Sequence, residues 1–199
     1  MMQRILHETN AMQYRSFLSG DGNFRYDIYP EYKANRRDAP RPKWLQPVRE
    51  HLVVAWNSSV TEDIEADDAM GIEQCLSNDD STIICSIDKD MLMIPGKHYN
   101  FVKQEFRTVS PLEGLRNFYY QLIMGDRTDN IPGYDGKMRQ KTPKFLESAV
   151  AYLDECMNEY EMFEHVRNMY NNDEAMLLSG RCLWIQRKEG DRWNFPNQQ

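Results

Sequence analysis

Seven carboxylates in three short segments could act together on divalent metal ions. Converging carboxylates repel one another unless cations neutralise them. Hard cations such as Mg²⁺ take oxygen ligands, and two of them about 4 Å apart can hold the attacking and leaving oxygens of a phosphodiester displacement. The residue types therefore favour metal-assisted phosphoryl chemistry. The seven are Glu65, Asp67 and Asp68 in IEADDAMG, Asp88 and Asp90 in SIDKDM, and Asp126 and Asp129 in GDRTDNIPG.

Each segment also has an ordinary structural interpretation. An acidic residue in the first turn of a helix is usually a cap, and its negative charge is stabilised by the helix dipole. EADD fits this interpretation. DKD after a strand is commonly a turn, and GDRTDNIPG could end a helix through Gly125 and Pro132. Each signal is weak alone, and their combination in this order favours a metal site.

The elements that carry these segments alternate between strand and helix. MQYRSFLSG is predicted as a short strand, STIICSI as a buried strand before Asp88, and NFVKQEFRTV as a weaker extended segment. Side chains beyond the carboxyl end of a parallel strand are where α/β sheets place their sites. PKWLQPVREHLVVAW predicts a helix with Pro47 near its first turn. Another helix is expected after Glu65, with an apolar face of Ala69, Ile72, Cys75 and Leu76.

The last half of the chain is mostly helical. SPLEGLRNFYYQLIMG has Ser110 as N-cap, Pro111 in the first turn and Glu113 closing a capping box. DEAMLLSGRCLWIQRK predicts a further helix, whereas FRYDIYPEYKANRRDAPRP is expected to be an exposed loop or arch. Strands and helices followed by helices alone indicate an α/β layer with a helical annex. Between the helix after Ser110 and the segment DEAMLLSGRCLWIQRK, apolar residues keep helical spacing for several turns: Leu146, Ala149, Val150, Leu153, Met157, Tyr160 and Phe163.

The charge distribution matters more than the net charge of −7, which taken alone disfavours a nucleic-acid partner. Seven lysines and arginines lie between residues 25 and 49, and a second basic cluster follows the third acidic segment. The four cysteines and four histidines are scattered, so reduced thiols are expected and a zinc site is not. No apolar run reaches the roughly 20 residues that span a bilayer, and the opening residues do not resemble a signal peptide.

The three acidic segments resemble, in their order, the motifs of the 5′-nuclease superfamily. This family comprises bacteriophage 5′–3′ exonucleases, flap endonucleases and the 5′-nuclease domain of bacterial DNA polymerase I. FRYDIYPEYKANR is similar to the segment that leads into the family's helical arch, and the resemblance covers roughly residues 17–144. It implies a PIN-like parallel sheet flanked by helices, with a C-terminal helix–turn–helix-type DNA-binding region. The implied domains are residues 1–125, with an arch at about 24–50, and residues 126–199.

The resemblance also implies roles for individual residues. Glu65, Asp67, Asp68 and Asp88 would serve a first Mg²⁺ ion, and Asp90, Asp126 and Asp129 a second, with Mn²⁺ able to substitute. Lys33 and Arg36 would contact the scissile phosphate and stabilise its developing charge, beside Arg25 on the DNA-binding segment and Tyr32 stacked on a base. Without the acidic motifs, Lys33 and Arg36 would be interpreted as a solvated basic loop. Contacts that position duplex backbone without reading its sequence would come from Lys137, Arg139, Lys141 and Lys144.

The chain departs from the family pattern at three places. The family opens with a β-strand that ends in a metal-binding aspartate, whereas this sequence begins at what resembles the following helix, MQRILHETNA. A late start site or a truncated chain would explain this, and the lost strand would leave a gap or an unpaired edge in the sheet. Another family aspartate has only Ser19 or Asp21 as counterparts here. YDGKMRQKTP keeps Gly136 but lacks further glycines, so a K⁺ site is not expected.

Two functions therefore stay open. One is a Mg²⁺-dependent 5′-nuclease acting on DNA with 5′ ends, flaps or single-strand/double-strand junctions, in phage replication or nucleotide salvage. Such a protein is expected in the cytoplasm, that of the host if phage-encoded, without membrane contact. The alternative is a catalytically impaired module that binds branched DNA, because the first ligand aspartate is absent. RNA-directed activity is a lesser alternative, and replication partners cannot be named from these motifs.

Overall fold

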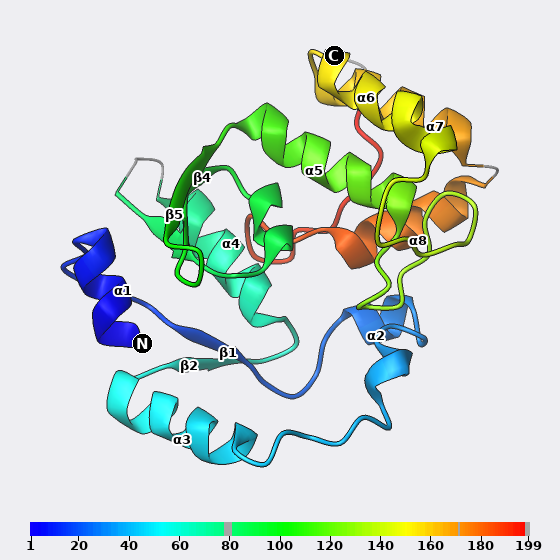
Figure 1. The fold of residues 1–199 in the computed structure, drawn as a ribbon. Helices are drawn as coiled ribbons and strands as arrows, with labels where there is room; N and C mark the ends of the chain where they lie inside the picture. Colours follow the sequence, from blue (N-terminus) through cyan, green and yellow to red (C-terminus); the bar gives the residue numbers. More distant parts are fainter. Residues whose placement is uncertain (78–80, 171, 198–199) are drawn as a thin grey trace. The chain divides into compact units, whose positions relative to one another are not determined.

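The computed structural model describes residues 1–77, 81–170 and 172–197 (Figure 1). Its contacts divide the chain into two compact units, each built from separate stretches of sequence. The sheet unit comprises Met1–Phe24, Ala39–Val109 and Ile185–Glu189. The helical unit comprises Arg25–Asp38, Ser110–Trp184 and Gly190–Gln199. The α/β class predicted from the sequence is confirmed, while the division into a catalytic region 1–125 and a helical DNA-binding region 126–199 stays a prediction.

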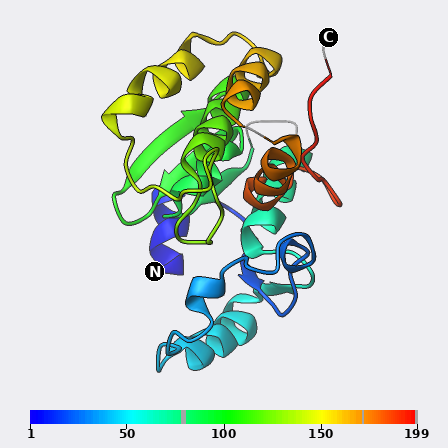
Figure 2. The ribbon, with the colours of Figure 1, turned by 90° about the vertical axis from the view of Figure 1, so that its right-hand side faces the viewer.

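The described strands of the sheet unit form two small sheets. In one, β1 (Phe17–Ser19) pairs in parallel with β2 (Ser59–Thr61). In the other, β3 (Ile83–Cys85) pairs in parallel with β4 (Gly96–Asn100), which pairs antiparallel with β5 (Glu105–Val109), and both views show β4 and β5 side by side (Figures 1 and 2). The strand predicted before Asp88 is confirmed as β3, and the strand predicted in MQYRSFLSG is confirmed over Phe17–Ser19 as β1. The extended segment predicted at residues 100–109 is confirmed from Glu105 to Val109, as β5, and its first part forms the turn that follows β4.

The helices of the sheet unit differ in how deeply they are buried. In α4 (Ala66–Leu76), Ala69 and Ile72 are buried as predicted, but Leu76 is 67% exposed, so the predicted apolar face is wrong at its last member. The other helices are α1 (Met2–Thr9) and α3 (Leu45–Trp56), neither of which has a buried residue, and the 3₁₀ turn η2 (Lys89–Met93). A small apolar core joins β3, η2 and the returning C-terminal segment through Ile84, Met91, Ile94 and Ile185.

The helical unit is organised around α5 (Pro111–Met124). The predicted capping box is confirmed, because the Ser110 amide donates to Glu113 Oε2 at 2.7 Å and the Glu113 amide to Ser110 Oγ at 3.2 Å. Around α5 lie α6 (Glu147–Glu155), α7 (Glu159–Met169) and α8 (Asp173–Leu183), with three short elements, α2 (Arg25–Ile28), η1 (Ala34–Arg36) and η3 (Lys144–Leu146).

The helical pattern across residues 146–163 is interrupted, which the sequence did not predict. Asn158 caps α7 by accepting from the Glu161 amide at 3.0 Å, and Met157 is 76% exposed. Because an N-cap residue has non-helical backbone angles, the cap separates α6 from α7.

Among the described residues, no helix combines the length and the apolar character that crossing a bilayer requires.

Candidate active site

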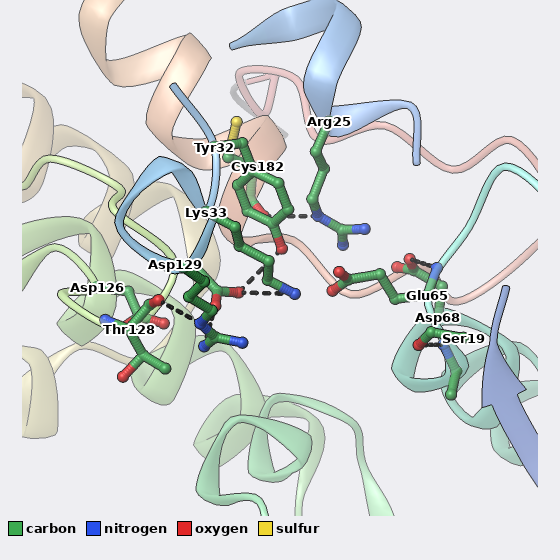
Figure 3. A network of polar contacts seen from close by, with 12 residues as sticks. Ser19, Arg25, Tyr32, Lys33, Glu65, Asp68, Asp126, Thr128, Asp129 and Cys182 are labelled. Atoms are coloured by element: carbon green, nitrogen blue, oxygen red, sulfur yellow. Dashed lines mark hydrogen bonds and ion pairs between the residues drawn. The ribbon is translucent and has the colours of Figure 1, made fainter. Parts of the chain in front are cut away.

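The first acidic segment forms the start of α4. Asp68 is fully buried, and its Oδ2 accepts from the Glu65 amide at 3.0 Å (Figure 3). Its Oδ1 accepts from the Gln186 amide, also at 3.0 Å. Glu65 and Asp68 together make a capping box, the structural alternative that the sequence left open. The Asp68 carboxylate therefore ties the beginning of α4 to residues 185–189. Glu65 and Asp67 are partly buried in the same first turn.

The second acidic segment follows β3, at the carboxyl end of a parallel strand as predicted. Asp88 caps the η2 turn, because its Oδ1 accepts from the Asp90 amide at 2.9 Å, and its own amide donates to Ser86 Oγ at 3.0 Å. Asp88 is exposed and Asp90 is partly buried. Both carboxylates thus belong to a locally ordered turn that starts at the end of the strand.

The third acidic segment is a tight loop after α5. The helix ends at Gly125, whose φ of 69° would be strained in a residue with a side chain. A Cβ there would also lie 2.5 Å from the Gly133 amide nitrogen. Asp126 and Ile131 exchange two backbone hydrogen bonds of 2.8 Å, and Asp126 Oδ1 accepts from the Thr128 amide at 2.7 Å. This loop holds Asp126 and Asp129 in one short, hydrogen-bonded turn.

Asp129 is held by residues 31–36, which we call the clamp segment. Its Oδ2 accepts from the Tyr32 hydroxyl at 2.9 Å and lies 3.5 Å from Lys33 Nζ, while its Oδ1 accepts from Arg36 Nη2 at 2.7 Å. Figure 3 shows the Tyr32 and Lys33 side chains directed at this carboxylate. The Lys33 amide also donates to the Asp129 carbonyl at 2.9 Å. Two positive charges and a hydroxyl therefore surround one carboxylate.

Further hydrogen bonds fasten the clamp segment to residues 127–130. Arg36 Nε donates to the Thr128 carbonyl at 2.9 Å, and Asn35 Nδ2 to the Arg127 carbonyl at 2.8 Å. Asn130 Nδ2 donates to the Glu31 carbonyl at 2.8 Å. Neither asparagine was predicted from the sequence to belong to the site. Asn130 has a left-handed φ of 59°, a conformation that asparagine tolerates better than most residues.

Two residues predicted to meet DNA are buried, which corrects the interpretation of this region as an exposed loop. Tyr32 is 1% exposed, with its ring 5.6 Å from that of Tyr26, so the ring does not face solvent in this conformation. Arg25 is 3% exposed and donates to the carbonyls of Cys182 and Trp184, each at 2.8 Å. Carbonyls at a helix end lack intrahelical partners, so Arg25 satisfies the end of α8.

The second basic cluster comprises Arg139, which pairs with Asp135, and three exposed lysines, of which Lys137 also lies 3.9 Å from Asp135 Oδ2. Arg139 Nη1 donates to Asp135 Oδ1 at 2.7 Å, and its guanidinium lies 5.5 Å from the centre of the Tyr134 ring. The hydrogen bond from Arg139 lowers the pKa of the Asp135 carboxyl. Arg139 is therefore committed to Asp135 here. The exposed members of the cluster are Lys137, Lys141 and Lys144.

The chemistry of the donors fits hard divalent cations. Within neither unit do the described residues bring together three or more His, Cys, Asp or Glu side chains as a metal site. The candidate donors are all carboxylate oxygens, the ligands that Mg²⁺ prefers. The Lys33 ammonium and the Arg36 guanidinium both contact the Asp129 carboxylate, which therefore already stabilises positive charge beside it.

Comparison with known proteins identifies relatives of this chain. Residues 1–118 match the family model described as 5′-3′ exonuclease, N-terminal resolvase-like domain. The chain is similar to the 5′-3′ exonuclease of Buchnera aphidicola subsp. Acyrthosiphon pisum, 30% identical over 193 residues, which covers 85% of this chain and 67% of that protein. It is 29% identical over 179 residues to the same-named protein of subsp. Schizaphis graminum, covering 80% of this chain but only 56% of that protein.

The fold is similar to that of the bacteriophage T5 flap endonuclease in a complex with DNA and metal ions. The TM-score is 0.62 at 18% identity, with 91% of this chain and 77% of that chain covered. At this identity the likeness concerns the fold.

Proposed function

Because the chain belongs to the 5′-3′ exonuclease family, we propose that it hydrolyses DNA phosphodiester bonds at 5′ ends, flaps or single-strand/double-strand junctions. The reaction would use two divalent ions, Mg²⁺ or in its place Mn²⁺. The observation that carries the proposal is the ion-pair network in which Lys33 and Arg36, from the segment that resembles the family's arch, contact Asp129 of the third acidic segment. A solvated basic loop would not need such fixed geometry.

The proposed roles follow from the chemistry of each group. Bound Mg²⁺ would supply an activated water and polarise the phosphodiester. Lys33 and Arg36 would hold the scissile phosphate, because a guanidinium fork matches phosphate oxygens and positive charge stabilises the charge that develops there. Asp68 would act as a positioning residue for α4. The oxygen ligands would come from Glu65, Asp67, Asp88, Asp90, Asp126 and Asp129.

Duplex DNA would be held mainly by the exposed lysines of the second basic cluster. Contacts from Lys137, Lys141 and Lys144 to phosphates would position the duplex without selecting a sequence, and they would weaken as salt concentration rises. Arg139 would join them only if it left Asp135.

One observation favours the alternative, a module that binds branched DNA without cutting it. Both oxygens of Asp68 are already bonded to backbone amides. A metal ion bound by this carboxylate would have to share its oxygens with these two amides. The two proposals agree on DNA binding and differ on turnover.

The deciding experiment is cleavage of a 5′-labelled flapped duplex by the full chain with Mg²⁺, and separately with Mn²⁺. The Asp126→Ala, Asp129→Ala double variant tests the third motif. Asp173→Ala is the matched control, because Asp173 pairs with Arg167 at 2.6 Å on the helical unit, outside the predicted site. Cleavage by parent and control but not by the double variant supports the nuclease. A parent that binds the flap without cleaving it supports the binding module. A parent that neither binds nor cleaves the flap refutes both proposals.

A further inference from the structure

The same ion pairs bring together two groups with separate proposed tasks. Lys33 and Arg36 are proposed to hold a DNA phosphate, and Asp129 to hold a metal ion. In the structure they hold each other, with Arg36 Nη2 2.7 Å and Lys33 Nζ 3.5 Å from the Asp129 oxygens. The Lys33 and Asp129 side chains are only 19% and 20% exposed, so water screens this contact incompletely.

Neither partner can perform its task fully while this pairing lasts. A divalent cation needs a carboxylate oxygen whose charge is not already neutralised, and a phosphate needs the N–H fork of Arg36, one end of which is bonded to Asp129. We propose that Asp129 exchanges partners when ligands bind. The ion pairs that Lys33 and Arg36 make with Asp129 break, Lys33 and Arg36 then bind a DNA phosphate, and Asp129 binds a divalent cation. This inference rests on the function proposed above.

The exchange makes the two ligands help each other bind. Whichever ligand arrives first must break the clamp ion pairs, and the second then meets a partner that is already released. Coupling of this kind is reciprocal, so Mg²⁺ raises DNA affinity by the same factor by which DNA raises Mg²⁺ affinity. The ion pairs also keep the clamp segment in one conformation before either ligand binds.

Arg36 and Arg37 provide a matched pair of variants. They are adjacent, and both are exposed, but Arg37 donates to the Pro30 carbonyl whereas Arg36 pairs with Asp129. Mg²⁺ affinity of the DNA-free chain, measured by titration calorimetry, should rise about twofold to fivefold in Arg36→Gln, the range that a partly exposed ion pair supports. Arg37→Gln removes the same charge one residue away and should leave the affinity at the parental value.

Asp129 and Asp126 give the second comparison, from the side of DNA. Asp126 lies on the same loop, but its Oδ1 accepts from the Thr128 backbone amide. In EDTA, where no cutting occurs, Asp129→Asn should bind a flapped oligonucleotide about twofold to fivefold more tightly than Asp126→Asn. Hydrogen exchange at residues 31–37 should also accelerate when Mg²⁺ is added to the DNA-free parent, because the Lys33 side chain loses its anchor.

The outcomes separate this inference from the proposed function. Equal Mg²⁺ affinities in the two arginine variants, or equal DNA affinities in the two asparagine variants, overturn the exchange. If the parent cuts flapped DNA but the two arginine variants, or the two asparagine variants, have equal affinities, the exchange is refuted and the proposed function is not. A parent that binds neither Mg²⁺ nor flapped DNA refutes the proposed function and the exchange with it. Thermal melting of each variant shows whether a change in affinity merely reflects unfolding.

Discussion

Asp68→Asn tests whether the buried carboxylate of the first acidic segment serves the fold or the metal. Its two oxygens accept from the Glu65 and Gln186 amides, each at 3.0 Å, and the side chain is fully buried. Asparagine has the same shape but only one acceptor oxygen, so its NH₂ group must face one of the two amides. One backbone donor then lies buried without a partner, next to a second donor.

The magnitude follows from these two bonds. A hydrogen bond to a charged group contributes about 1.5–3 kcal/mol, and a buried donor without a partner costs about 1–3 kcal/mol. Because asparagine keeps one of the two bonds in neutral form, we expect the free energy of unfolding to fall by about 2–4 kcal/mol. This is a large part of the roughly 5–15 kcal/mol that keeps a domain folded.

Urea unfolding of the chain in EDTA, followed by circular dichroism, measures the loss, and hydrogen exchange over residues 65–76 locates it. Glu62→Gln is the control, because Glu62 is an exposed carboxylate of the same unit. A parental urea midpoint for Asp68→Asn in EDTA, with a deficit only when Mg²⁺ is present, would refute the reasoning. Asp68 would then be a metal ligand that the fold does not need.

Two further predictions concern the helical unit. Gly180→Ala should destabilise the chain by about 1–3 kcal/mol despite the better helix propensity of alanine, because the new Cβ would lie 2.2 Å from the buried Trp193 ring. In a Trp193→Leu background, Gly180→Ala should cost less in urea unfolding than it does in the parent, and a Gly180→Ala variant as stable as the parent would contradict the packing. Asp135→Asn should cost up to about 1 kcal/mol near pH 7, and this difference should disappear in acid once the Asp135 carboxyl is protonated in the folded protein. The Arg139 hydrogen bond lowers the pKa of Asp135, so its contribution is present above the unfolded pKa and lost as pH falls through the folded pKa; a difference that persists in acid would contradict it.

Local signals predicted the starts of helices well. The capping box at Ser110 involves residues three positions apart, so the sequence contains the whole interaction. The same holds for the start of α4 after Glu65. The break at Asn158 also had a local signal, because Asn158 and Glu161 have the spacing of a cap, but apolar periodicity across the break outweighed it.

Long-range contacts explain what the sequence could not predict. Tyr32 is buried because its hydroxyl meets Asp129, 97 residues away, and Asp68 is capped by Gln186, 118 residues away. Nothing near Tyr32 in the sequence distinguishes a buried ring from one that stacks on a base. The family resemblance predicted which residues form the site. It could not predict the partners that these residues have in the ligand-free chain, because those depend on which distant segments pack together.

The carboxylates predicted from one pattern therefore differ in what a mutation should reveal. Asp68 is bonded to backbone amides, which are fixed by the fold and cannot turn to another ligand. Asp129 is bonded to two long cationic side chains, which can swing to a phosphate at the cost of a few rotamers. The Asp68 carboxylate, bonded to fixed amides, should therefore contribute mainly to the stability of the fold. The Asp129 carboxylate, bonded to side chains that can move, should be able to change its partners. Loss of Asp68 should thus appear first in the urea midpoint, and loss of Asp129 first in the affinities for Mg²⁺ and DNA.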